Sequence, residues 1–312
     1  MFGERFAQFM ELRGRRIVEA AGALWYSTQM RIYMKIPFHE PCNPSADDLR
    51  RVMQIARALG VRYPSLNQAG YPSGIYVCRH TRYDLSCVHP KQRAPVRRGL
   101  EACEIRPIEE AQLLVEGLQC NLDTMKRQNR FETEFGDRRQ WKRLVKAVQQ
   151  CPSITAIGAF ISGKLAAYAI TNREDGWFHI LHQMSRKDFL NQHPNHALTY
   201  ELTKQAAEDA SVHTICYGLV GLSSGTGLDE YKRRFGYEVL PQNSVFWLRP
   251  GVDKFLSNSL TIDALASLRK LLPKNQRLQR IESVLVGARR TRIGSCRFHQ
   301  SIDHSLSAKV EK

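Results

Sequence analysis

Apolar residues between positions 103 and 150 follow two different periods. The stretch CEIRPI, at 103–108, favours a short strand. In EEAQLLVEGLQCNL and DRRQWKRLVKAVQQ, which follow, apolar residues recur three and four positions apart, and this spacing predicts two amphipathic helices. Asp137 opens the second stretch, where its side chain can cap a helix. The expected order is therefore strand, helix, helix.

The next apolar runs have the length and composition of strands. ITAIGAFI and LAAYAIT are joined by the short Gly-containing loop SGK, and WFHILHQM follows after the turn NREDG. Strands joined by such short turns must pair antiparallel. This part of the chain is expected to form a three-stranded meander.

Residues 191–208 begin as a polar loop and continue as an amphipathic helix. The run HTICYGLV then predicts a buried strand, GLDEYKRRFG a short helix that Gly236 ends, and SVFWLRP a last strand. The resulting order lacks the regular strand–helix alternation of a dinucleotide-binding fold. It predicts an α+β fold with helices on an antiparallel-led sheet.

The first hundred residues partly repeat this order. RRIVEA, GALWYST and RIYMKIPF predict another meander, and GIYVCRH a later strand. Between them, residues 44–60 have helical spacing, with a capping-box-like start at Ser45 and Asp48 and Gly60 as the expected stop. Meander, helix and strand thus occur twice, roughly 145 residues apart, which indicates an internal duplication with a shortened first copy.

This duplication divides the chain into four parts. We expect a shortened first lobe at 1–100 and a second lobe at 101–250. Helical spacing continues at 251–287, and the polar, basic residues 288–312 are expected to be disordered.

Composition adds a location and a class of partner. No apolar run approaches the ~20 residues of a membrane span, and the first residues lack a signal-peptide pattern, so we expect a soluble, cytoplasmic protein. The eight cysteines are scattered without a CxxC pair, which favours reduced thiols. The formal net charge of +16 favours anionic partners such as phosphates or nucleic acid, although it also suits a generally basic protein.

Three stretches together resemble a known family. VHPKQRAPVRRGLEACEIRPI, HPNHALTYELTKQAAEDA and GLDEYKRRFG are similar, in order and spacing, to segments of GCN5-related N-acetyltransferases (GNAT), and specifically of their FemAB-like double-domain branch. The resemblance implies two GNAT-like lobes and the transfer of an acyl group to a small-molecule or peptide amine. The implied donor is acyl-CoA, such as acetyl-CoA. The alternatives are an aminoacyl-tRNA ester, with tRNA as a partner, or a binding module without catalysis.

The resemblance also implies where an acyl-CoA donor would bind. The family's Arg/Gln-x-x-Gly-x-Gly/Ala run corresponds to Gln192, Asn195 and Ala197, with His196 between the last two, and a helix N-terminus suits a pyrophosphate. The family's first Gly is Asn195 here, whose side chain limits close approach and can instead serve as an N-cap. Met184 lies in the strand whose backbone the family uses to hold the reacting carbonyl.

Five side chains are candidates for catalysis. FemAB-like proteins place a lysine near the end of the short helix, which implies that Lys232 faces the donor or the carbonyl, while EYKRR can equally be a solvated basic face. The attacking amine must lose a proton, and the candidates for accepting it are His182, Glu201, Tyr217 and Asp229. The sequence does not choose among them.

Two rival chemistries are weaker. GLSSG matches the nucleophile elbow of serine hydrolases, but Thr226 and Gly227 separate it from the next helix, so Ser223 is not expected to be a nucleophile. His179 and His182 are three apart on a strand and should point to opposite faces, which disfavours a metal site.

Overall fold

The structure is a computed structural model. It describes residues 3–28, 31–128, 132–220 and 227–256, together with ten single residues between 264 and 291. The chain folds into two compact units, which are interleaved in sequence. Unit 1 comprises Met1–Gly14 and Ile75–Leu240, and unit 2 comprises Arg15–Gly74 and Pro241–Lys312. Ser223, and most of the predicted helical extension and basic tail, lie outside the described residues.

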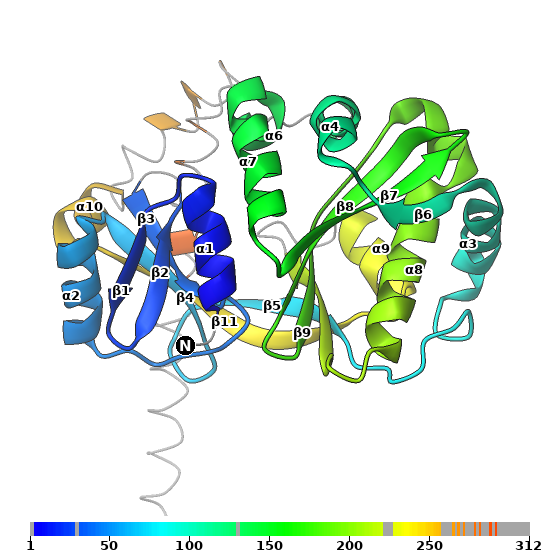
Figure 1. The fold of residues 1–312 in the computed structure, drawn as a ribbon. Coiled ribbons are helices and arrows are strands. Elements are labelled where there is room, and N and C mark those ends of the chain that lie inside the picture. Colours follow the sequence, from blue (N-terminus) through cyan, green and yellow to red (C-terminus); the bar gives the residue numbers. More distant parts are fainter. Residues whose placement is uncertain are drawn as a thin grey trace, which may run out of the picture. The chain divides into compact units, whose positions relative to one another are not determined.

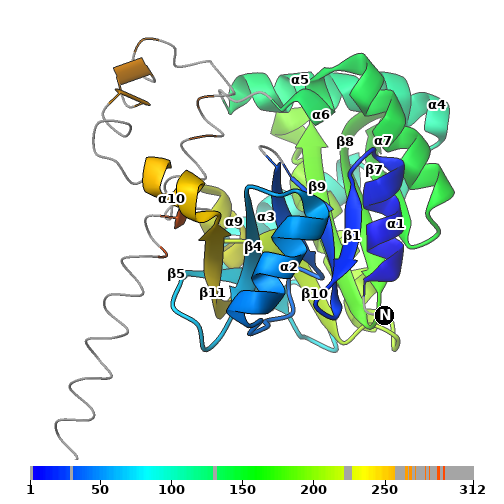
Figure 2. The same ribbon diagram turned by 90° about the vertical axis from the view of Figure 1, so that its left-hand side faces the viewer.

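The sheet of unit 2 is built around the first predicted meander. The strands β1 (Ile17–Ala20), β2 (Ala23–Ser27) and β3 (Ile32–Ile36) pair antiparallel, and β3 then pairs parallel with β4 (Gly60–Ser65). The C-terminal part of β11 (Glu238–Leu248) adds an antiparallel strand beside β4. α2 (Ala46–Ala56) makes the crossover and packs on β1 and β4 (Figure 2).

The sheet of unit 1 repeats this plan. The strands β7 (Ile154–Ile161), β8 (Lys164–Glu174) and β9 (Trp177–Ser185) form the second meander, and β6 (Glu104–Pro107) borders it. β10 (Thr214–Leu219) pairs parallel with β9, and the end of β5 (Tyr71–Cys78) pairs antiparallel with β10. α8 (Pro194–Glu208) makes the crossover. The predicted α+β class and the repeated order of meander, helix and parallel strand are confirmed.

Each half of the chain gives its last strand to the other unit. β5 follows the first meander but pairs in unit 1, and β11 follows the second but pairs in unit 2. The boundaries between the two units therefore fall at 14/15, 74/75 and 240/241, whereas the sequence suggested a boundary near residue 100. The local sequence of β5 or β11 does not show which unit the strand joins, because an apolar strand fits either sheet.

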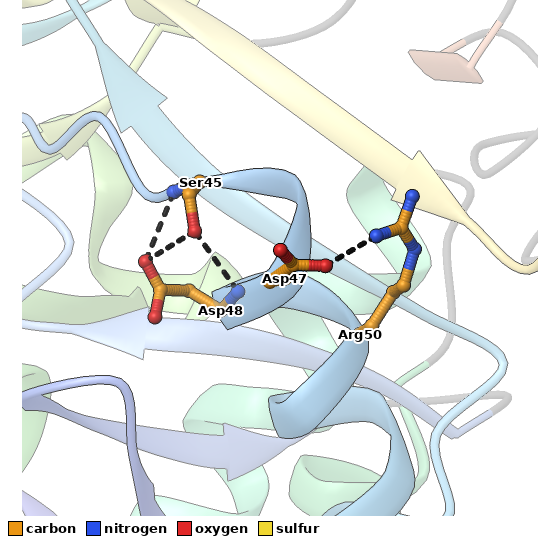
Figure 3. Close-up of polar contacts among 4 residues, drawn as sticks. All are labelled: Ser45, Asp47, Asp48 and Arg50. Atoms are coloured by element: carbon orange, nitrogen blue, oxygen red, sulfur yellow. Dashed lines mark hydrogen bonds and ion pairs between the residues drawn. The ribbon is translucent and has the colours of Figure 1, made fainter.

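α2 shows how local sequence sets an element. Ser45 caps the helix, and its hydroxyl accepts from the Asp48 amide at 3.1 Å, while the Asp48 carboxylate accepts from the Ser45 amide at 3.1 Å (Figure 3). The predicted capping box is confirmed. The predicted stop at Gly60 is wrong, because the helix ends at Ala56 with Arg57 in the left-handed conformation. Gly60 instead begins β4, which the sequence analysis missed because glycine and proline weaken the strand pattern.

Helices cover both faces of the unit 1 sheet. On one face, α3 (Pro90–Ala102) and α8 lie side by side (Figure 1) and pack with α9 (Gly227–Arg234) around a shared apolar cluster. The opposite face carries α1 (Glu4–Leu12), α5 (Leu118–Arg127), α6 (Thr133–Gly136) and α7 (Arg138–Gln150). Asp137 caps α7, as predicted. Short helical segments complete the chain: α4 (Glu110–Gln112), η3 (Lys187–Gln192) and α10 (Pro250–Leu256).

A π-helical turn changes the buried face of the first predicted helix. The turn, η2 (Leu113–Gly117), lies between α4 and α5. It shifts the helical register, so that Leu113, Gly117 and Cys120 are buried while Val115 and Leu122 are 60% and 45% exposed. The apolar spacing of EEAQLLVEGLQCNL, which includes Val115 and Leu122, predicts a different buried face, and that prediction is wrong.

Acidic residues fix α1 to unit 1. The Glu174 carboxylate accepts from the amides of Arg5 and Phe6 at 2.7 and 3.0 Å, and the Asp175 carboxylate accepts from Gly3 N at 3.1 Å. Negative groups at a helix start satisfy its free amides and its dipole. A segment at the beginning of the chain thereby joins the second meander. None of the described helices is long and apolar enough to cross a membrane.

Two strands beside α8 are irregular. A bulge at Leu181 shifts the register of β9, because Thr171 pairs with Ile180 whereas Ile170 pairs with His182. The pairing of β10 with β9 ends at Cys216 and His179, although both strands continue. The two strands therefore splay apart beside the start of α8.

Candidate active site

Two hydrogen bonds fix the end of α9. Gly236 follows the helix in the left-handed conformation, as predicted. The Tyr83 hydroxyl donates to Phe235 O at 2.7 Å, and His89 N donates to Arg234 O at 2.8 Å. These bonds attach the last turn of α9 to the segment before α3. They set the position of Lys232, which lies on this turn.

Lys232 lies in an aromatic box. Its side chain is buried, with 5% of the residue exposed, and Nζ lies 4.6 Å from the centre of the Tyr76 ring and 5.0 Å from that of Tyr217. A Cβ on Gly218 would lie 3.9 Å from Nζ. Across the part of the chain that the structure describes, Nζ donates no hydrogen bond. The ring faces attract the ammonium, but they do not accept its protons as an oxygen would.

The bulge in β10 creates this box. Cys216 pairs with Val77 and Leu219 with Ile75, so Tyr217 and Gly218 together oppose Tyr76. Gly218 has φ +74°, a conformation that L side chains rarely adopt. This arrangement presents the rings of Tyr76 and Tyr217 to the lysine above them.

Burial shifts the acid–base balance of Lys232. Desolvation lowers the pKa of Lys232 to about 8, and the nearby Cys216 and Asp229 partly oppose that change. Asp229 is also buried, and it helps burial to raise the pKa of Tyr76. Lys232 is therefore mainly protonated at pH 7, as a cation for which the described residues supply no hydrogen-bond acceptor.

A polar network fills the gap between β9 and β10. The Gln183 side-chain amide of β9 donates to Asn195 O at 3.1 Å, and its carbonyl accepts from Thr199 Oγ1 at 3.1 Å and from the Tyr217 hydroxyl. The Tyr231 hydroxyl donates to Asn195 O at 3.0 Å and lies 3.0 Å from Thr199 Oγ1. Residues from β9, β10, α8 and α9 thus meet where the sheet opens.

The start of α8 differs from the expected anion site. His193, with φ 55°, is the N-cap, so the alternative of Asn195 as N-cap is wrong. The Asn195 side chain instead donates to Ser185 Oγ at 2.8 Å and accepts from Gln183. Gln192 ends the preceding segment η3.

The first amides of α8 already have acceptors. His196 N and Ala197 N donate to His193 O at 3.0 and 3.2 Å. A Cβ on Gly99 of α3 would lie 2.7 Å from the same oxygen, so α3 covers this turn closely. Ala197 is fully buried.

His196 lies inside the α3–α8–α9 layer. Its Nε2 is 2.9 Å from the Gln92 side chain, and its ring contacts those of Tyr231 and Phe235. Desolvation lowers the pKa of His196 to about 4, so this histidine is neutral at pH 7.

Two predicted residues lie on the opposite face of β9 from the network. His182 packs edge-to-face on Phe135, with ring centres 4.6 Å apart, and Met184 shares its face. The bulge at Leu181 also places His179 on this face, so the expectation that His179 and His182 point to opposite faces is wrong. Among the described residues, no group of three His, Cys, Asp or Glu side chains could hold a metal ion.

The remaining candidates separate into two places. Tyr217 and Asp229 lie beside Lys232. Glu201 lies on α8 and accepts from Gln205 at 2.9 Å, one helical turn away. The structure thus brings together three of the five residues considered for catalysis.

The sequence analysis missed Tyr76 and Gln183. Gln183 carried a usable signal, because an amide within the apolar run WFHILHQM must find partners when it is buried. Tyr76 carried none, since its contact with Lys232 depends on a strand from the other half of the chain.

Comparisons with known proteins identify the fold. Neither the search with protein-family models nor the search of curated proteins found a match. Among solved structures, FemX is similar with a TM-score of 0.57 and 10% identity, over 80% of this chain and 92% of that one. The C-terminal domain (DUF2156) of a putative lysylphosphatidylglycerol synthetase from Agrobacterium fabrum is similar with a TM-score of 0.53 and 14% identity, over 83% and 90%.

A conserved protein of unknown function from Bacteroides thetaiotaomicron gives a TM-score of 0.51 with 12% identity, over 78% of this chain and 88% of that one. At such low identities these likenesses concern the fold. The chain has a GNAT/FemAB-like fold.

Proposed function

We propose that the protein transfers an acyl group to an amine and that Lys232 stabilises the oxyanion formed on the way. The observation that carries this proposal is the buried ammonium between Tyr76 and Tyr217, which has no acceptor in the described protein. Burying a cation without an acceptor is costly, so the arrangement suits a group that accepts its protons during the reaction.

The proposed chemistry assigns a task to each group near Lys232. The amine attacks the acyl carbonyl, and the carbonyl oxygen gains negative charge and accepts a hydrogen bond from Nζ. The Tyr217 hydroxyl holds Gln183, while its ring faces Nζ. Asp229, beside Lys232, is the proposed carboxylate that receives the proton lost by the amine, directly or through water. The oxyanion then re-forms the carbonyl as the bond to the donor's sulfur or ester oxygen breaks, and the leaving group takes up that proton.

Acyl-CoA is the first proposed donor. The splay beside α8 supports it, because this is where the family resemblance locates the donor. The fit at the start of α8 is limited, however, since His196 N and Ala197 N are already bonded and Gly99 lies against the same turn. No step of the proposed chemistry depends on a phosphate at this position.

The second proposed donor is an aminoacyl ester carried on tRNA. The network around Gln183 favours it, because hydrogen bonds from four elements close the gap that a CoA arm would enter. An aminoacyl ester that reaches Lys232 directly from solvent does not need to enter the gap between β9 and β10. FemX has the same fold, and the exposed Lys91, Arg97 and Arg98 of α3 offer cations for a nucleic acid.

Native mass spectrometry and thermal unfolding test the proposal. A retained acyl-CoA, or a rise in Tm with saturating acetyl-CoA, identifies the first donor. Binding of an aminoacyl-tRNA that weakens steeply with salt identifies the second. Lys232→Met should leave donor binding largely intact and slow transfer to amines by roughly 10²–10³. The proposal fails if neither donor class binds or if Lys232→Met transfers at the normal rate.

A further inference from the structure

Unit 2 contains a pocket of about 540 Å³ at the end of α2. The volume falls within the range of small-molecule sites. Apart from Ala56, its lining residues are basic or carry a hydroxyl: Arg16, Arg31, Arg57, Ser27, Thr28 and Tyr33. The lining contains three guanidinium groups and no carboxylate.

Two of the guanidinium groups are held by backbone carbonyls. Arg16 donates to Ala56 O at 3.3 Å and to Ile55 O at 3.1 Å, and Arg31 donates to Arg57 O. These acceptors are the last carbonyls of α2 and its cap, where cations are favourable. The bonds fix the two groups and leave each with further N–H donors, because a guanidinium has five.

Helix capping does not explain Arg57. In the described part of the chain its guanidinium makes no hydrogen bond or ion pair, although it lines the pocket. Its φ of 50° belongs to the end of α2 and needs no ligand, whereas the position of its side chain has no such explanation. Among the described residues, none of the three guanidinium groups that line the pocket has a carboxylate partner.

We propose that this pocket binds a small molecule that carries a phosphate monoester or a diphosphate. Guanidinium groups match the geometry of phosphate oxygens, and three positive charges suit a group with two or three negative charges better than a single carboxylate. The hydroxyls of Ser27 and Tyr33 line the same space, and the volume exceeds that of one phosphate, so the pocket has room for an organic part. All the lining residues belong to unit 2, whereas Lys232 and the residues around it belong to unit 1.

Calorimetric titration of the full chain with inorganic pyrophosphate, phosphate and acetate tests the proposal. Pyrophosphate should bind more tightly than phosphate, and acetate should not bind. Arg57→Gln removes one charge and its donors without breaking a bond seen in the fold, and it should weaken pyrophosphate binding about tenfold. Arg57→Lys keeps the charge but loses the planar fork, and it should give an intermediate loss.

Arg51→Gln is the matched control. Arg51 lies on the same helix and is exposed, but it does not line the pocket, so its loss should leave the affinity unchanged. Far-UV circular dichroism and Tm confirm that each variant is folded. The proposal is overturned if pyrophosphate does not bind at millimolar concentration or if Arg51→Gln weakens binding as much as Arg57→Gln.

Discussion

The two units use cations in opposite ways. In unit 1, a single ammonium is buried between two aromatic rings, and desolvation lowers the pKa of Lys232 to about 8. In unit 2, three exposed guanidinium groups surround a pocket, and two of them donate to the end of α2. Burial makes the charge of Lys232 costly and adjustable, whereas an arginine stays protonated at any pH at which the protein is folded.

This contrast indicates different tasks. A cation with a pKa near neutrality, held by groups that accept no proton, suits a transient partner that gains charge during a reaction. Cations that are always charged and partly held by carbonyls suit a ligand that is already anionic before it binds. The predictions below test this contrast, beginning with the largest effect.

Replacing Lys232 should have the largest effect. Lys232→Met keeps the length of the side chain but removes the donor to the oxyanion, and we expect the transfer rate to fall by roughly 10²–10³. Single-turnover assays provide the measurement, with whichever of the two proposed donors binds in the tests described under Proposed function. Lys142→Met, on the exposed face of α7, removes an equal charge and should leave the rate unchanged. Equal rates for both variants would contradict the assigned role.

The pH dependence of stability follows from the same side chain. The pKa of Lys232 is about 8 in the folded state and near 10.5 when the side chain is free, so between these values the unfolded state binds more protons. Stability from this group therefore rises with pH across the window from 8 to 10.5. At pH 7 the cost of the buried charge is fully present, at roughly 3 kcal/mol.

Urea unfolding of the wild type and Lys232→Met at pH 7 and pH 9.5 measures this cost. The variant should be the more stable protein at pH 7, and its advantage should shrink by about half at pH 9.5. The transfer rate of the wild type should fall as pH rises through about 8, because the proposed role requires the ammonium. A rate that rises through this range would instead make Lys232 a base.

The sequence predicted most elements of the fold for local reasons. The two meanders depend on the periodicity of apolar residues, and the capping box at Ser45 and the Asp137 cap depend on hydrogen bonds between residues close in sequence. A short stretch of sequence is therefore enough to predict each of them. It could not predict that β5 and β11 exchange units. It also missed the π-helical turn at Leu113–Gly117, where one extra residue moved the buried face.

The site was harder to predict than the fold because its parts come from distant segments. Lys232 and Tyr217 were named from the family resemblance, and the structure does place them together. Tyr76 joins them only through the pairing of β5 with β10, and the faces of His179 and His182 depend on the bulge at Leu181. Bulges and strand exchange are tertiary features that single-stretch patterns do not encode.

Gly218 tests whether the box depends on the β10 bulge. Gly218→Ala adds a Cβ at an ordinary contact distance, 3.9 Å from Nζ of Lys232, but its φ of +74° strains any L residue. We expect a loss of about 1–2 kcal/mol in the free energy of unfolding and a lower transfer rate. Gly163→Ala, at φ +76° in an open turn, is the control. It should cost similar stability without affecting transfer.

Tyr217→Phe separates the ring from the hydroxyl. The ring stays beside Nζ, but Gln183 loses one donor to its buried carbonyl. We expect a loss of about 1 kcal/mol in stability, with the pH dependence assigned to Lys232 retained. Thermal unfolding and the pH–rate profile give both readouts. If the pH dependence disappeared with the hydroxyl, the ring would not be the group that surrounds the cation.

Arg16→Gln should give the smallest effect and completes the comparison. Its guanidinium donates to the carbonyls of Ile55 and Ala56 from an exposed position, so its loss should destabilise the protein by about 0.5 kcal/mol. The sign is opposite to that of Lys232→Met at pH 7, because an exposed cation at a helix end lowers the free energy of the fold and a buried unpaired one raises it. High salt should reduce the Arg16 effect, since exposed charges are screened, and should leave the Lys232 effect nearly unchanged. Urea unfolding at 0.05 and 1 M NaCl measures how salt changes the effect of each substitution. Equal salt responses for Arg16→Gln and Lys232→Met would show that burial does not explain the opposite signs.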